Sequence, residues 1–235
     1  MELWTNLTQS LLNLFLKTPC ALCQRLSAAC LCDDCQRQLQ RCQLQPTEQW
    51  IPGQLPLLSW GAYSGELKQA LAQLKYNNQP QLAQPLGYRL GQAWLASPLA
   101  KRLKTQKSPL SRPVAIPIPL HASRKRQRGY NQAELLAQSF CQVTRLPLQR
   151  QGLTRIRATE AQFGLSAAAR QQNLSCAFRP SQKLLQQAPA RAILLDDIYT
   201  TGATARSAAQ TLHHFNIEVY SIVTVAKTLA QKSRD

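Results

Sequence analysis

Two adjacent carboxylates, Asp196 and Asp197, end an apolar run at residues 193–195 and stand just before a glycine among threonines. Gly202 permits a backbone turn that other residues resist. A helix that starts after this turn would point its N–H groups and the positive end of its dipole at one anion. The residues that would form this loop are Thr200, Thr201, Gly202, Ala203 and Thr204.

Hydroxyl and backbone donors that converge in this way predict a cradle for a single phosphate. The two acids beside it are placed to bind the diol of a sugar phosphate. The segment lacks the lysine and the spacing of the nucleoside-triphosphate loop G-x-x-x-x-G-K-[ST]. The alternative is an ordinary strand–turn–helix connection whose threonines only cap the helix.

A second chemical pattern lies near the N-terminus, where six of the eight cysteines fall between Cys20 and Cys42. Two C-x2-C pairs, with eight residues between them, match the ligand spacing of a tetrahedral zinc site. We expect this zinc to be structural, because four thiolates leave no open position for catalysis. Disulfides or free thiols are the alternative, and Cys30 could replace Cys32 among the ligands. The expected ligands are Cys20, Cys23, Cys32 and Cys35.

The chain is strongly basic, with 28 Lys and Arg against 11 Asp and Glu and a net charge of +17. This excess favours a polyanionic partner such as nucleic acid, a phosphorylated ligand or an anionic membrane face. A merely basic, solvated surface is the alternative. The densest cationic cluster is Arg124, Lys125, Arg126 and Arg128.

The elements that must position these residues alternate between strands and helices. Expected strands are 57–64, 113–120, 191–198 and 218–228; expected helices are 65–77, 82–97, a helix capped by Asn131, and 204–215. This order predicts an α/β fold with a mostly parallel sheet covered by helices, in which ligands bind beyond the carboxyl ends of the strands. The basic, proline-punctuated segment 96–113 is expected to be a surface loop.

Three regions are expected along the 235 residues. Residues 1–45 would hold an amphipathic helix and the four-cysteine zinc finger, 46–58 a linker, and 59–235 the α/β domain. No apolar run reaches the roughly 20 residues that a transmembrane helix needs. The N-terminus is a poor signal peptide, so we expect a cytoplasmic protein in which thiols stay reduced.

The segment "ILLDDIYTTGAT" closely resembles the phosphoribosyl-pyrophosphate loop of type I phosphoribosyltransferases. The resemblance implies that Asp196 and Asp197 bind the ribose hydroxyls and that residues 200–204 hold the 5′-phosphate. It also implies Mg²⁺ bound with phosphoribosyl pyrophosphate. The cations Arg124, Lys125, Arg126 and Arg128 would then face the pyrophosphate.

The whole chain resembles the ComF competence family. The four-cysteine segment, "LKYN", "PIPL", "RGYNQAELLA" and "LTRIRATEAQFGLSAAARQQNL" follow the pattern of that family in order. Many of its members carry further cysteine doublets, whereas this chain adds only Cys42. The resemblance implies a type I phosphoribosyltransferase-like fold and a role in the uptake of transforming single-stranded DNA, at the inner face of the membrane.

Two functions stay open at this point. One is a phosphoribosyltransferase whose acceptor is unknown. The other is a non-catalytic competence factor that keeps the fold and binds single-stranded DNA or partner proteins, such as a competence helicase or other DNA-uptake proteins. The intact acid–threonine loop favours the first function, because paired aspartates would repel a DNA backbone. The net charge of +17 favours the second.

Overall fold

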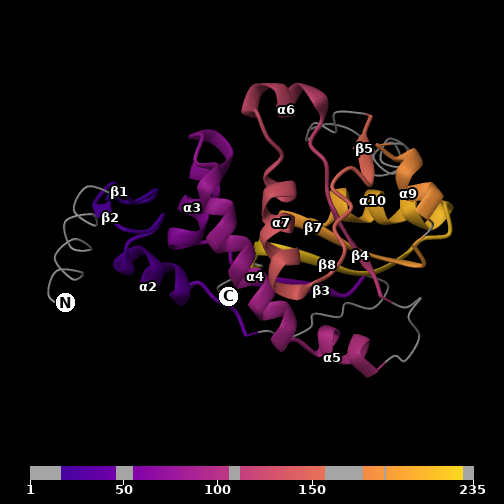
Figure 1. Cartoon of the computed structure of the whole chain (residues 1–235), viewed down its shortest axis with the longest axis horizontal. Coiled ribbons are helices and arrows are strands. Elements are labelled where there is room, and N and C mark those ends of the chain that lie inside the picture. Colours follow the sequence, from indigo (N-terminus) through magenta and orange to yellow (C-terminus); the bar gives the residue numbers. More distant parts are fainter. Residues whose placement is uncertain (1–16, 46–54, 106–111, 157–176, 188, 230–235) are drawn as a thin grey trace, which may run out of the picture.

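A four-stranded parallel sheet forms the centre of the fold (Figure 1). The computed structural model describes residues 17–45, 55–105, 112–156, 177–187 and 189–229. The strand order is β3-β8-β7-β4. Their bounds are β3 (Leu57–Ala62), β4 (Val114–Pro117), β7 (Arg191–Tyr199) and β8 (Glu218–Lys227). The predicted parallel α/β fold is confirmed.

Helices cover both faces of this sheet, as the strand–helix alternation predicts. Apolar side chains of the first face pack with α3 (Gly65–Tyr76), α4 (Ala83–Ala96) and α7 (Gln132–Thr144). The opposite face packs with α10 (Ala203–His214), α9 (Gln182–Gln187) and the small sheet of β5 (Leu153–Arg155) and β6 (Phe178–Pro180). A short 3-10 helix, η1 (Pro80–Leu82), precedes α4.

Two glycines inside α4 allow it to pack closely against α7. A Cβ at Gly87 would lie 2.5 Å from the Leu136 carbonyl oxygen, and a Cβ at Gly91 would lie 2.7 Å from the Val143 Cβ. Glycine costs helix stability relative to alanine. Here that cost is offset by the packing that the close approach of the two backbones permits.

The prediction of a surface loop at 96–113 is wrong for its first half, which forms α5 (Pro98–Thr105). Pro98 stands at the first helical position, where its missing N–H costs nothing. The Ser97 hydroxyl accepts a hydrogen bond from the Ala100 N–H at 3.3 Å, which caps the helix. Leu99 is fully buried, so the helix is also held by packing.

The cysteine-rich segment forms a small lobe of two short strands, β1 (Thr18–Pro19) and β2 (Leu26–Ser27), and α2 (Asp33–Arg41). Leu31 and Leu39 belong to the same buried cluster as the α3 side of the domain. The Leu44 N–H donates to the Trp60 carbonyl at 2.9 Å, so the lobe is joined to β3. The expected amphipathic helix at residues 3–15 lies outside the described residues.

Most of the expected linker at 46–58 also lies outside the described residues, which resume at residue 55. Strand β3 begins at Leu57, which lies inside the range 46–58 that was expected to be a linker. Within the described ranges, no helix combines the length and the apolar character that crossing a bilayer requires.

Candidate functional site

The two carboxylates of the site lie inside β7 rather than beyond its end, because the strand continues to Tyr199. Successive side chains of a strand point to opposite faces of its sheet. Asp196 therefore points to the α10 side with Leu194, and Asp197 points to the α3 side with Leu195. The two acids are adjacent in the sequence, but in the strand they face opposite sides of the sheet and contact different residues.

Asp196 lines a hollow together with the loop that follows β7. Its Oδ1 accepts a hydrogen bond from the Asp197 N–H at 2.8 Å. Burial and the neighbouring Asp197 charge raise the pKa of Asp196 to about 7, whereas Lys75 and Arg155 act to lower it. The carboxyl is therefore poised to change charge near neutral pH.

Asp197 is buried, with 4% of its surface exposed. The Lys75 Nζ, from the last turn of α3, lies 2.9 Å from Asp197 Oδ2. The contact is an ion pair without hydrogen-bond alignment, since Oδ2 accepts no aligned hydrogen bond. The sequence pattern assigns no role to Lys75, although this residue belongs to the "LKYN" segment of the family resemblance.

The loop after β7 makes the turn that its glycine predicts. Gly202 has a φ of 73°, and a Cβ there would lie 2.2 Å from the Tyr199 hydroxyl. The Thr201 hydroxyl accepts from the Ala203 N–H at 3.4 Å, and Arg206 donates to the Thr201 carbonyl at 2.8 Å. The loop thus places the N-terminus of α10 at the hollow. Residues around the hollow include Asp196, Thr200, Thr201, Gly202, Ala203 and Thr204.

The cationic cluster is on a separate helix, α6 (Ala122–Arg128), which precedes the helix capped by Asn131. This helix projects between β4 and α7, beside the end of α3 (Figure 1). Asn131 caps α7 as expected, accepting from the Ala133 N–H at 3.2 Å. The Glu134 carboxylate does not complete a capping box with an aligned bond; it lies 3.9 Å from Arg150.

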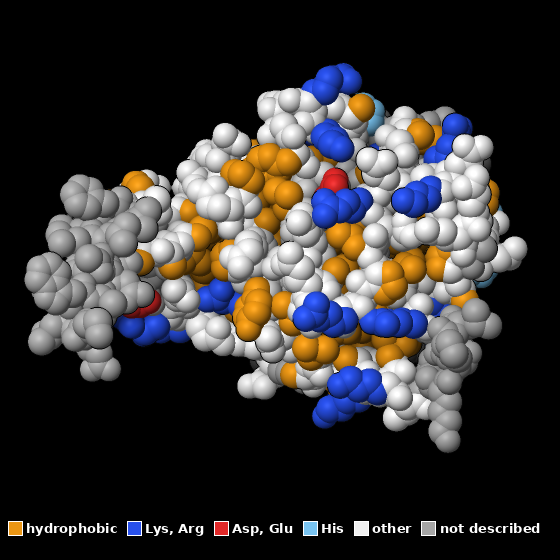
Figure 2. Space-filling view, in the orientation of Figure 1, with side chains coloured by type: hydrophobic (Ala, Val, Ile, Leu, Met, Phe, Trp, Pro, Cys, Tyr) orange, Lys and Arg blue, Asp and Glu red, His pale blue; other side chains and the backbone are white. Residues whose placement is uncertain are grey.

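A groove runs between the end of α3 and α6, and we call it the α3–α6 groove. Three of the four predicted cations line it, and Lys125 is not among the lining residues. Figure 2 shows basic side chains at the tip formed by α6 and along a row lower on the same face. The residues that line the groove are Lys75, Tyr76, Asn78, Arg124, Arg126, Gln127, Arg128 and Gly129.

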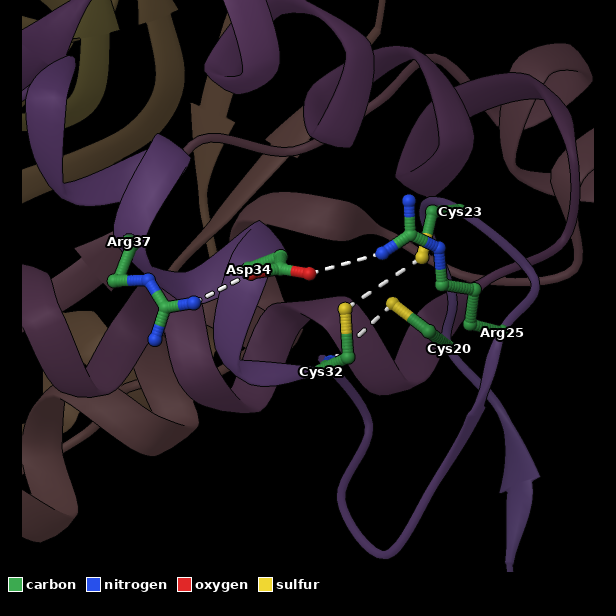
Figure 3. A network of polar contacts seen from close by, with 6 residues as sticks. All are labelled: Cys20, Cys23, Arg25, Cys32, Asp34 and Arg37. Atoms are coloured by element: carbon green, nitrogen blue, oxygen red, sulfur yellow. Dashed lines mark hydrogen bonds and ion pairs between the residues drawn. The ribbon is translucent and has the colours of Figure 1, made fainter.

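The four predicted cysteine ligands come together in the lobe, with all their Sγ atoms within 4.8 Å of one another. Zn–S bonds of about 2.3 Å in a tetrahedron place sulfurs ~3.8 Å apart. The Cys23 and Cys32 sulfurs are 3.5 Å apart, which fits that spacing (Figure 3). The cluster can hold a metal ion. It contains Cys32, whereas Cys30 and Cys42 lie outside it.

The surroundings of Cys20 also favour its thiolate. Burial alone would raise the pKa of Cys20, but backbone N–H groups of Cys23, Cys32 and Leu22 lower it to about 6. Burial and the neighbouring thiols raise the pKa of Cys35. Beside the cluster, Arg25 and Arg37 both pair with Asp34 and brace the lobe (Figure 3).

The polar stretch 159–173 lies outside the described residues. In the described part of the molecule, an acid pair and a glycine–threonine loop stand at the carboxyl end of a central parallel strand, with a cationic groove nearby. The class that these features define is an α/β protein of the type I phosphoribosyltransferase-like fold, with an N-terminal cysteine cluster.

Comparison with known proteins identifies the family. The chain is 32% identical to competence protein F of Haemophilus influenzae over 167 residues, which cover 71% of this chain and 70% of that protein. It is 31% identical to DNA utilization protein YhgH of Salmonella typhimurium over 176 residues, covering 74% and 72%. Competence protein ComFC of Bacillus subtilis is 33% identical over 99 residues, covering 42% and 38%. No protein-family model matches the chain. The chain belongs to the ComF family of competence protein F and YhgH.

Proposed function

We propose that this protein binds phosphoribosyl pyrophosphate with Mg²⁺ and acts in the uptake and handling of transforming DNA. The observation that supports binding of this ligand is the hollow that Asp196 lines together with the glycine–threonine loop. The DNA role is supported by relatives named as competence and DNA utilization proteins.

Each part of the ligand has a place in this proposal. Residues 200–204 hold the 5′-phosphate with backbone N–H groups, hydroxyls and the positive end of α10. Asp196 takes the ribose diol, and Asp197 assists from the strand position next to it. The pyrophosphate lies toward Arg124, Lys125, Arg126 and Arg128. Mg²⁺ takes substrate phosphates together with one or two carboxylates in such sites, and Asp196, which lines the hollow, would supply one.

If transfer occurs, its transition state resembles an oxocarbenium ion at the ribose anomeric carbon. The protein then works mainly by positioning the ribose and by neutralising the departing pyrophosphate. Lys75 has a further part, because its ion pair with Asp197 holds that carboxylate in place on the α3 side of β7. Removing Lys75 would leave an uncompensated buried charge beside the ribose.

The cysteine cluster is proposed to hold one structural zinc ion through Cys20, Cys23, Cys32 and Cys35. A lobe of this size has few buried side chains of its own, so metal binding supplies folding free energy.

Titration calorimetry with phosphoribosyl pyrophosphate and Mg²⁺ tests the ligand proposal. Wild type is expected to bind, and the double variant Asp196→Asn with Asp197→Asn is expected to lose binding. Glu218→Gln is the matched control, because this exposed acid pairs with Arg191 at the start of β8. Absence of heat from wild type at millimolar ligand would refute the proposal.

A second candidate is a non-catalytic DNA-binding factor. The net charge of +17 and the cationic α3–α6 groove favour it, since phosphate neutralisation dominates non-specific nucleic-acid affinity. In this case the protein works at the inner face of the membrane with a helicase or other DNA-uptake proteins. Release of pyrophosphate in the presence of candidate acceptors separates the two functions, because only a transferase releases it.

A further inference from the structure

An aromatic ring stands open in the α3–α6 groove. Tyr76, the last residue of α3, is 76% exposed, more than any other large apolar side chain in the described ranges. The guanidinium carbon of Arg128 lies 5.6 Å from the centroid of its ring. Much of the ring therefore stays open to a planar group. Figure 2 shows apolar surface to the lower left of the basic side chains of the α6 tip, and acidic surface directly beneath them.

None of the described residues that line this groove is acidic. The lining residues include four cations, and they enclose about 700 Å³. Lys75 is paired with Asp197. Arg124 and Arg126 form no ion pair with any residue that the structure describes. Two arginines are thus open to an anionic ligand.

The two walls of the groove are fixed relative to each other. The Tyr130 hydroxyl donates to the Leu74 carbonyl at 2.5 Å and ties the end of α3 to the chain that follows α6. The ion pair of Lys75 with Asp197 ties the same helix end to β7. The helix end that carries Tyr76 is therefore tied to the chain after α6 and to the strand that carries Asp197.

We propose that the α3–α6 groove binds single-stranded DNA, with one base stacked on Tyr76 and neighbouring phosphates held by Arg124 and Arg126. An aromatic platform combined with a cationic groove is how proteins bind single strands without sequence preference. A paired base keeps its faces inside the duplex, so an open ring selects unpaired bases. The proposal rests on the DNA-handling role above and not on phosphoribosyl pyrophosphate.

Fluorescence anisotropy with two oligomers tests the stacking. One is a thymidine strand of about 15 nucleotides, long enough for one single-strand site, and the other is an abasic phosphodeoxyribose strand of the same length. Wild type is expected to bind the thymidine strand more tightly. Tyr76→Ala is expected to weaken thymidine binding about 5- to 100-fold, to the level of the abasic strand. Tyr76→Phe is expected to keep the wild-type affinity, because it keeps the ring.

A matched control is Tyr88→Ala, which removes a half-exposed tyrosine of α4 that does not line the groove. It is expected to bind both oligomers as wild type does. The double variant Arg124→Ala with Arg126→Ala is expected to reduce the salt dependence for both oligomers, by about 0.7 in log–log slope for each phosphate that it no longer neutralises. Circular dichroism of each variant checks that the fold is retained.

Several outcomes overturn the proposal. Equal wild-type affinity for the two oligomers excludes base stacking. Equal losses for Tyr76→Ala and Tyr88→Ala exclude this ring as the platform. If Tyr76→Ala weakens calorimetric binding of phosphoribosyl pyrophosphate and not DNA, the groove belongs to the sugar-phosphate ligand. Wild type that binds the sugar phosphate but no DNA refutes the DNA role, whereas the reverse result refutes only the ligand proposal.

Discussion

At the scale of single residues, Asp196 and Asp197 have different surroundings, because successive side chains of a strand point to opposite faces of the sheet. Asp197 is buried against α3 and paired with Lys75, whereas Asp196 faces the loop and the hollow. The pKa of Asp196 is raised to about 7. One carboxylate is thus paired with a lysine, and the other changes charge near neutral pH.

This difference predicts a pH-dependent affinity. Burial favours protonated Asp196, and the ribose diol and Mg²⁺ need the carboxylate. Calorimetric affinity for phosphoribosyl pyrophosphate with Mg²⁺ is therefore expected to rise as pH increases through the Asp196 pKa of about 7. The ligand also titrates in this range, so its own titration is measured separately and subtracted. A corrected affinity that stays constant across this pH range would show that Asp196 is not responsible.

The same shift makes a prediction for stability. The pKa of Asp196 is raised in the folded protein from an ordinary value of 3.8 to about 7, so the folded state binds more protons than the unfolded state between these values. The contribution of this group to the free energy of unfolding is complete below about pH 4 and is lost as pH rises toward 7. Thermal unfolding of wild type should therefore lose Tm relative to Asp196→Asn across this window. Parallel Tm curves for the two proteins would contradict the shift.

At the scale of elements, the contact between α4 and α7 depends on residues without side chains. Gly91→Ala would gain about 0.8–1.0 kcal/mol of helix propensity. Its Cβ would lie 2.7 Å from the Val143 Cβ, and overpacking of this kind costs about 1–3 kcal/mol. We expect a net loss of stability in chemical denaturation.

The partner position supplies the control for this prediction. Val143→Gly removes both the Cβ and the Cγ1 that a Cβ at Gly91 would meet. The double variant Gly91→Ala with Val143→Gly is therefore expected to lose less stability than the sum of the single variants. Additive losses would place the cost of Gly91→Ala somewhere other than this contact.

At the scale of the whole molecule, the cysteine lobe and the α/β domain share one buried cluster. Leu39 of α2 and Leu67 of α3 both belong to it. Loss of metal from the four-cysteine site should therefore weaken the domain as well as the lobe. Chelation is expected to lower the Tm of the complete chain in calorimetry, and metal analysis of wild type is expected to give one zinc per chain.

Two variants sharpen the zinc experiment. Cys23→Ser removes a member of the cluster and should abolish stoichiometric zinc binding. Cys42→Ser is the control, because this thiol lies outside the cluster and contacts the Ser64 carbonyl at 3.7 Å. A domain transition that keeps its Tm after chelation would show that lobe and domain unfold separately.

Much of the fold could be predicted from the sequence. The run at 191–198, the glycine turn and the helix after it all appear as expected, since each depends on residues that adjoin in the chain. The helix α5 could not be predicted in this way, because the prolines and cations of segment 96–113 resemble a loop. The stability of the helix comes from the Ser97 cap and buried Leu99. The roles of Gly87 and Gly91 depend on α7, so the sequence of α4 alone does not show them.

The sequence by itself determined the chemistry that this protein can offer: four thiols at zinc spacing, two acids before a phosphate-type loop, and a dense cluster of cations. These are local patterns, and local geometry follows from neighbouring residues. Only the tertiary structure decided that Lys75 neutralises Asp197, and that Tyr76 lies open beside Arg128. The residues of each pair are far apart in the chain, so the distances between them depend on how the helices pack on the sheet. That packing is driven by hydrophobic burial, which is non-directional.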